Sequence, residues 1–99
     1  MPGTPETIIA FDFGLRRIGV AVGQQVTHSA NPLETIKNGE HGPDWPRIET
    51  LVREWRPQRL IVGLPLHADG TASDIGDHVR EFVAALGRFD LPVDTVDER

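Results

Sequence analysis

Two acidic residues near opposite ends of the chain have the chemistry to hold a metal ion. Asp12 lies inside an apolar segment, residues 7–13 with the sequence TIIAFDF, and Glu98 is the residue before the last. A carboxylate among apolar residues is costly to bury unless something pairs with it. Carboxylate oxygens suit Mg²⁺ and Mn²⁺, and two such ions about 4 Å apart can activate water and stabilise the leaving oxygen of a phosphodiester. We therefore predict that Asp12 and Glu98 are catalytic residues that share a divalent ion.

Both acids also have a structural interpretation. Asp12 could cap the backbone amides of the short link at 14–17, since acids held as caps or ion-pair partners are common without any catalytic role. Glu98 lies close to the end of the chain, where acids are usually solvated. The residues by themselves leave these alternatives open.

Two adjacent arginines follow Asp12 in the link. Arg16 and Arg17 stand where the phosphate backbone of a nucleic acid could reach them. The alternative is a solvated turn with no binding role. We predict that both arginines contact nucleic acid.

Glycine and proline mark two loops beside the candidate acids. Gly14 begins the link after the first apolar segment, and the segment VGLPLHADG at 62–70 contains Gly63 and Pro65. Such a loop could bring backbone amides close to a ligand, or it could be an ordinary connection from a strand to a helix. We predict that Gly14, Gly63 and Pro65 belong to active-site loops.

The apolar pattern predicts the elements that position these residues. Strands are typical of short apolar or alternating segments, and helices of apolar residues that recur three or four positions apart. The first three strands should form an antiparallel meander, and helical crossovers should make the last two parallel to the first. We expect a mixed α/β sheet of five strands at 7–13, 18–24, 27–36, 59–65 and 91–98, a polar loop at 37–44, and helices between Asp44 and Pro57 and at 73–86.

Composition limits the classes of protein to which the chain could belong. Ninety-nine residues are enough for one domain with a modest core. The chain has no cysteine, no apolar segment long enough to span a membrane and no signal peptide, so we expect a cytoplasmic protein without a membrane partner. The net charge of −5 argues against a domain that coats nucleic acid with positive charge. A local basic patch and bound metal ions could still attract it.

Three motifs in this order resemble the YqgF/RuvX family. They are FDFGLRRIGVAVG, IVGLPLHADGT and the terminal DER, and the resemblance covers essentially the whole chain. It implies an RNase H-like fold and a metal-dependent nuclease. The family was first described as a Holliday junction resolvase and is now associated with processing of the 5′ end of pre-16S rRNA in ribosome biogenesis.

The resemblance also assigns roles to particular residues. Asp12 matches the metal-binding acid of the first strand, and Glu98 matches the acid of the DER motif. Arg99 of that motif joins the arginines expected to bind nucleic acid. The family pattern continues past this motif into a helical region with a third metal-binding aspartate, which has no counterpart before Arg99. We therefore expect a single domain, residues 1–99, truncated after the DER motif, that binds ions weakly, cleaves poorly and self-associates through the surface left bare.

Other functions remain open alongside nuclease activity on structured RNA. One is a resolvase-like endonuclease acting on branched DNA. Another is a nucleic-acid-binding or regulatory protein without catalysis, which the missing third acid favours. The last is an ATP-binding module, since an aspartate followed by a glycine turn also holds phosphates in the actin/hexokinase superfamily. Those proteins need two such domains, and the length allows one.

Overall fold

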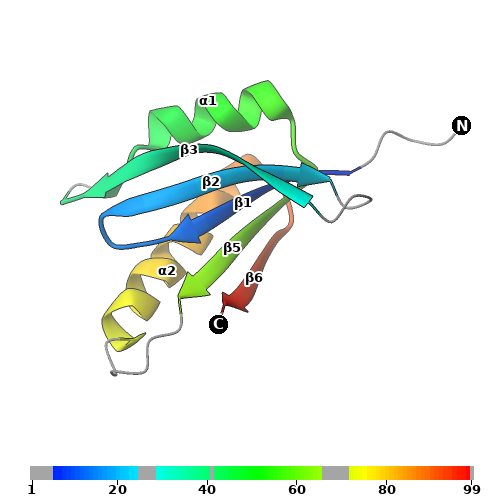
Figure 1. The fold of residues 1–99 in the computed structure, drawn as a ribbon. Helices are drawn as coiled ribbons and strands as arrows, with labels where there is room; N and C mark the ends of the chain where they lie inside the picture. Colours follow the sequence, from blue (N-terminus) through cyan, green and yellow to red (C-terminus); the bar gives the residue numbers. More distant parts are fainter. Residues whose placement is uncertain (1–5, 25–28, 41, 66–71, 99) are drawn as a thin grey trace, which may run out of the picture.

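One curved sheet and two α-helices form most of the described part of the molecule (Figure 1). The computed structural model describes residues 6–24, 29–40, 42–65 and 72–98. Within these ranges the elements are β1 (Thr7–Phe13), β2 (Arg17–Gln24), β3 (Ser29–Gly39), β4 (Gly42–Pro43), α1 (Trp45–Trp55), β5 (Arg59–Pro65), α2 (Ala72–Leu86), the 3₁₀ helix η1 (Gly87–Phe89) and β6 (Val93–Glu98).

The strand order is β4-β3-β2-β1-β5-β6. Strands β1, β2 and β3 form the predicted antiparallel meander, and β5 and β6 follow in parallel with β1. The expected mixed α/β sheet is therefore confirmed. It has six strands rather than five, because β3 continues to Gly39 and the two residues of β4 pair with its end. Part of the predicted loop at 37–44 is therefore paired as β-strand, which its polar composition did not indicate.

The two faces of the sheet differ in what covers them. Successive side chains of a strand point to opposite faces, and the burial of β1 alternates accordingly. Both helices pack on one face, and together with it they form a single core cluster of Ile9, Phe11, Phe13, Ile18, Val20, Ile36, Ile48, Leu51, Leu60, Val62, Val79, Phe82 and Leu86. Neither α1 nor α2 covers the other side, which we call the open face and define by Ala10, Asp12, Gly19, Ala21 and Ile61.

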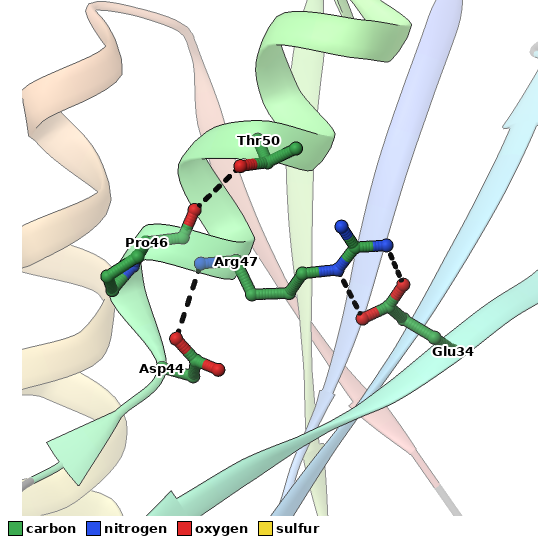
Figure 2. A network of polar contacts seen from close by, with 5 residues as sticks. All are labelled: Glu34, Asp44, Pro46, Arg47 and Thr50. Carbon is green, nitrogen blue, oxygen red and sulfur yellow. Dashed lines mark hydrogen bonds and ion pairs between the residues drawn. The ribbon is translucent and has the colours of Figure 1, made fainter.

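Polar contacts fix α1 where the sequence predicted it (Figure 2). Asp44 is the N-cap, and its carboxylate accepts a hydrogen bond from the backbone N–H of Arg47 at 3.3 Å. The guanidinium of Arg47 also donates to both carboxylate oxygens of Glu34 on β3, at 2.6 and 2.8 Å. The helix ends as Arg56 adopts a left-handed backbone with φ of 47° just before Pro57.

Phe82 of α2 joins the two helices to the sheet. Its ring lies 5.4 Å from the ring of Phe11 in an edge-to-face arrangement and 5.4 Å from that of Trp45 on α1. The guanidinium of Arg88 lies over that indole, 4.1 Å from the ring centroid. No helix in the described ranges is long and apolar enough to cross a membrane.

Candidate active site

Asp12 is the next-to-last residue of β1, and it projects from the open face. In the register it has Gly19 of β2 on one side and Gly63 of β5 on the other. A Cβ atom at Gly19 would lie 3.5 Å from the Cβ of Asp12, so the missing side chain leaves room beside the carboxylate. Asp12 is exposed. Because successive side chains of a strand point to opposite faces, the carboxylate avoids the burial cost that its apolar neighbours in the sequence suggested.

An open cavity of about 510 Å³ lies over this part of the open face. Small residues, including Ala10 and Ala21, form much of its floor beside Asp12. A floor without bulky side chains lets an extended ligand approach the strands closely. The carboxylate is thus accessible from a broad surface rather than from a narrow pocket.

Glu34 also lines the cavity, but its carboxylate is paired with an arginine of α1. Glu34 pairs with Arg47 through the two hydrogen bonds of Figure 2. The hydrogen bond from Arg47 lowers the pKa of Glu34 below its ordinary value. The bidentate pair ties β3 to α1, and we therefore do not count Glu34 as a second metal ligand.

Asn38 holds the turn that follows Asp12. Its side chain is buried, and Nδ2 donates a 2.7 Å hydrogen bond to the carbonyl oxygen of Gly14. Its backbone N–H donates to the carbonyl oxygen of Arg16 at 2.9 Å. Among the described residues, the side chain of Asp12 takes part in no hydrogen bond or ion pair. Asn38, not Asp12, therefore secures the turn, and the capping interpretation of Asp12 does not hold for the described part of the chain.

The sequence interpretation missed Asn38 for an identifiable reason. Residues 37–44 are rich in glycine, proline and charge, which is typical of a loop. The available signal was a polar residue two positions after Ile36, and so on the same face of a strand, but only the pairing of β3 shows that Asn38 is buried.

The turn after β1 leaves no room for a side chain at Gly14. A Cβ atom there would lie 2.7 Å from the carbonyl oxygen of Arg17, closer than real contacts allow. The glycine therefore permits a tight reversal directly after β1. The reversal leaves both Arg16 and Arg17 exposed at the edge of the sheet.

The parallel strands bring the remaining candidates to one edge. Gly63 of β5 pairs with Asp12 of β1, and Pro65, at the end of β5, pairs with Glu98, at the end of β6. Ligands of open α/β sheets bind at such strand ends. The backbone thus gathers these positions as the sequence predicted.

The structure describes the side chain of one of the two predicted metal ligands. The side chains of Pro65 and Glu98, residues 66–71 and all of Arg99 lie outside what the structure describes, so the shared ion and the Arg99 contact stay predictions. Within the described ranges no three His, Cys, Asp or Glu residues form a group that could hold a metal. Asp12 is therefore the one candidate ligand whose side-chain setting is defined.

Comparison with known families identifies the chain. A family model described as "RuvX: Holliday junction resolvase" matches residues 6–99. The chain belongs to the RuvX family. A RuvX relative from Nitrosococcus oceani, named "Putative pre-16S rRNA nuclease", is 54% identical over 99 residues, which are 99% of this chain and 65% of the relative. A relative of the same name from Azotobacter vinelandii is 50% identical over 96 residues, covering 96% of this chain and 68% of its own.

Solved structures confirm the RNase H-like fold. Thermus thermophilus RuvC in complex with a Holliday junction substrate superposes with a TM-score of 0.65 at 17% identity, covering 93% of this chain and 66% of that chain. A second structure of Thermus thermophilus RuvC gives a TM-score of 0.60. The RuvX chain therefore has the RuvC-like fold and spans about two thirds of the length of these relatives.

Proposed function

We propose that this RuvX chain carries the active face of a metal-dependent nuclease that hydrolyses phosphodiester bonds in structured RNA. The observation that carries the proposal is the exposed carboxylate of Asp12 between two glycine positions of an RNase H-like sheet. The relatives' name favours pre-16S rRNA as the substrate class. Cleavage at its 5′ end during ribosome biogenesis remains what the family resemblance implies. Cytoplasmic location remains the prediction from a composition without cysteine.

The donor set fits a divalent ion of the Mg²⁺ or Mn²⁺ kind. Asp12 and Glu98 would hold it through hard carboxylate oxygens, with water and phosphate oxygens completing the coordination. Such an ion supplies activation of water and stabilisation of charge on the leaving oxygen. The glycine positions beside Asp12 keep the approach clear for a phosphate, and Arg16, Arg17 and Arg99 would hold the flanking backbone.

A second candidate is cleavage of branched DNA. The family description and the RuvC complex with a Holliday junction favour it, because both connect this fold with four-way junctions. The phosphodiester chemistry at Asp12 would be the same for both substrates. The choice between them depends on what the rest of the open face contacts.

We further propose that the open face mediates self-association. Val96 is 48% exposed and lines the cavity with the half-buried Ile61. Exposed apolar surface on a sheet favours burial against a partner. Light scattering at several protein concentrations, with Val96→Lys as the comparison, tests this; a concentration-independent monomer contradicts it.

A cleavage assay tests the proposed activity. Labelled RNA from the 5′ region of pre-16S rRNA and a labelled four-way DNA junction are incubated with Mg²⁺ or Mn²⁺ and the parent chain, Asp12→Asn or Asp90→Asn. Asp90→Asn is the matched control, because Asp90 is exposed and takes part in no described ion pair. Asparagine also tolerates the left-handed backbone of residue 90. Cleavage by the parent and Asp90→Asn but not by Asp12→Asn supports the proposal. Equal cleavage by all three contradicts it, and binding without cleavage by the parent favours the non-catalytic alternative. Titration with ATP tests the remaining alternative, the nucleotide-binding module.

A further inference from the structure

Two exposed cations face each other across β2 and β3. Arg17 and Lys37 are direct partners in the antiparallel register. The backbone N–H of Asn38 donates to the carbonyl oxygen of Arg16, so the next pair along the ladder is a non-hydrogen-bonded pair. Side chains approach most closely in pairs of that kind. The two positive charges therefore share one small area of surface.

That area belongs to the open face that carries Asp12. In the register Asp12 lies opposite Gly19, and Gly19 lies opposite Thr35. Arg17 is two residues from Gly19 on β2, and Lys37 is two residues from Thr35 on β3. Two residues of a strand span about 7 Å and return to the same face. The cations and the carboxylate are thus parts of one continuous surface.

No carboxylate among the described residues forms an ion pair with either cation. The ion pairs within the described ranges use Arg47, Arg59, Arg80 and Arg88, and neither member of the Arg17–Lys37 pair takes part. Like charges directly opposite on neighbouring strands destabilise a sheet. In a chain of net charge −5, an uncompensated positive pair beside the candidate site points to an anionic ligand.

We propose that Arg17 and Lys37 together bind the phosphodiester backbone of the nucleic acid and hold it across β2 and β3 toward Asp12. The proposal rests on the proposed function and adds Lys37, which the sequence interpretation did not include. Between Arg17 and the carboxylate the floor of β2 is Gly19, so no side chain of β2 blocks the nucleic-acid backbone there. Contacts of this kind to phosphates carry no base specificity.

Salt-dependent binding separates this role from a structural one. Affinity for a fluorescent RNA hairpin and for a fluorescent four-way DNA junction is measured by anisotropy in EDTA over a series of KCl concentrations. The proteins are the parent chain, Lys37→Gln, Arg17→Gln and the control Arg53→Gln, which removes an exposed cation from the last turn of α1. Urea unfolding of each variant is measured in parallel.

We expect Lys37→Gln and Arg17→Gln each to lower the magnitude of the slope of log K against log salt by about one. Each should also bind more weakly to whichever probe the parent binds. The control should keep the parental slope, and Lys37→Gln should unfold at the same or a higher urea concentration because a like-charge contact is removed. The role of Lys37 is overturned if Lys37→Gln keeps the parental slope, if the slope of the control falls equally, or if Lys37→Gln is unfolded. Each of these results leaves the nuclease proposal standing. If the parent binds neither probe, both proposals fail.

Discussion

Asn38 on β3 donates a 2.7 Å hydrogen bond from Nδ2 to the carbonyl oxygen of Gly14, two residues after Asp12. This contact ties the turn between β1 and β2 to a strand that is not its sequence neighbour. The same residue binds the other end of the turn through its backbone. The positions of the candidate carboxylate and of Arg17 therefore depend on a buried amide in β3.

Asn38→Ala should destabilise the protein by about 1–3 kcal/mol, because it leaves the carbonyl oxygen of Gly14 without its buried partner. Urea unfolding followed by circular dichroism measures the loss. Asn31→Ala, at an exposed position of the same strand, should change the free energy of unfolding by less than about 0.5 kcal/mol. Equal effects of the two substitutions would show that the bond does not secure the turn.

Gly14→Ala should cost about 1–3 kcal/mol, because the new Cβ would meet the backbone carbonyl of Arg17 and force the turn to shift. Gly39→Ala is the matched control, since a Cβ at that position meets nothing within 4 Å. Thermal unfolding of both variants tests the difference. A Gly14→Ala protein as stable as the control would mean that the turn relaxes freely.

Gly19→Val should keep the fold and weaken the site. Valine favours strands, and a Cβ at this position makes only an ordinary 3.5 Å contact with Asp12. The added methyl groups would crowd the carboxylate, so Mn²⁺ affinity by calorimetry should fall while urea stability is maintained. Ala21→Val, farther along the same strand and face, should bind Mn²⁺ as the parent does. Unaltered affinity in Gly19→Val would show that the ion does not approach over this strand.

The Glu34–Arg47 pair should stabilise the protein at neutral pH and lose its effect in acid. Because Arg47 lowers the pKa of Glu34 in the folded state, the contribution is present above the unfolded pKa and disappears as the pH falls through the folded pKa. The stability difference between the parent and Glu34→Gln should therefore shrink below the ordinary value of 4.5. Urea unfolding between pH 7 and pH 3 tests it, with Glu40→Gln, at an exposed position, as the control. A difference that is constant across this range contradicts the assignment.

The sequence predicted the fold well because its elements are locally consistent. Asp44 was identifiable as an N-cap. The period-two burial of β1 was not predictable, because residues 7–13 place apolar side chains on both faces and suggested a sheet covered on both sides. The extension of β3 and the pairing of β4 were not predictable, because a two-residue strand in a polar segment has no periodicity to detect.

The candidate site was predicted in part. Asp12 and the glycine positions were identified from residue type and order, but the exposure of Asp12 follows only from the observation that both helices pack on the opposite face. Asn38 and Lys37 act through partners far away in sequence, Gly14 and Arg17. Pairings of that kind depend on strand register, which the local sequence does not determine.

The central claim is that Asp12 holds a divalent ion on the open face. Paramagnetic broadening of amide NMR signals by Mn²⁺ tests it without requiring cleavage, using the parent chain, Asp12→Asn and the control Asp90→Asn. We expect Mn²⁺ to broaden the amide signals of Gly19 and Gly63, the register neighbours of Asp12, in the parent and the control. Asp12→Asn should abolish this broadening while its free energy of unfolding stays within about 0.5 kcal/mol of the parent. The same broadening in Asp12→Asn, or broadening in the parent centred away from these residues, would contradict it.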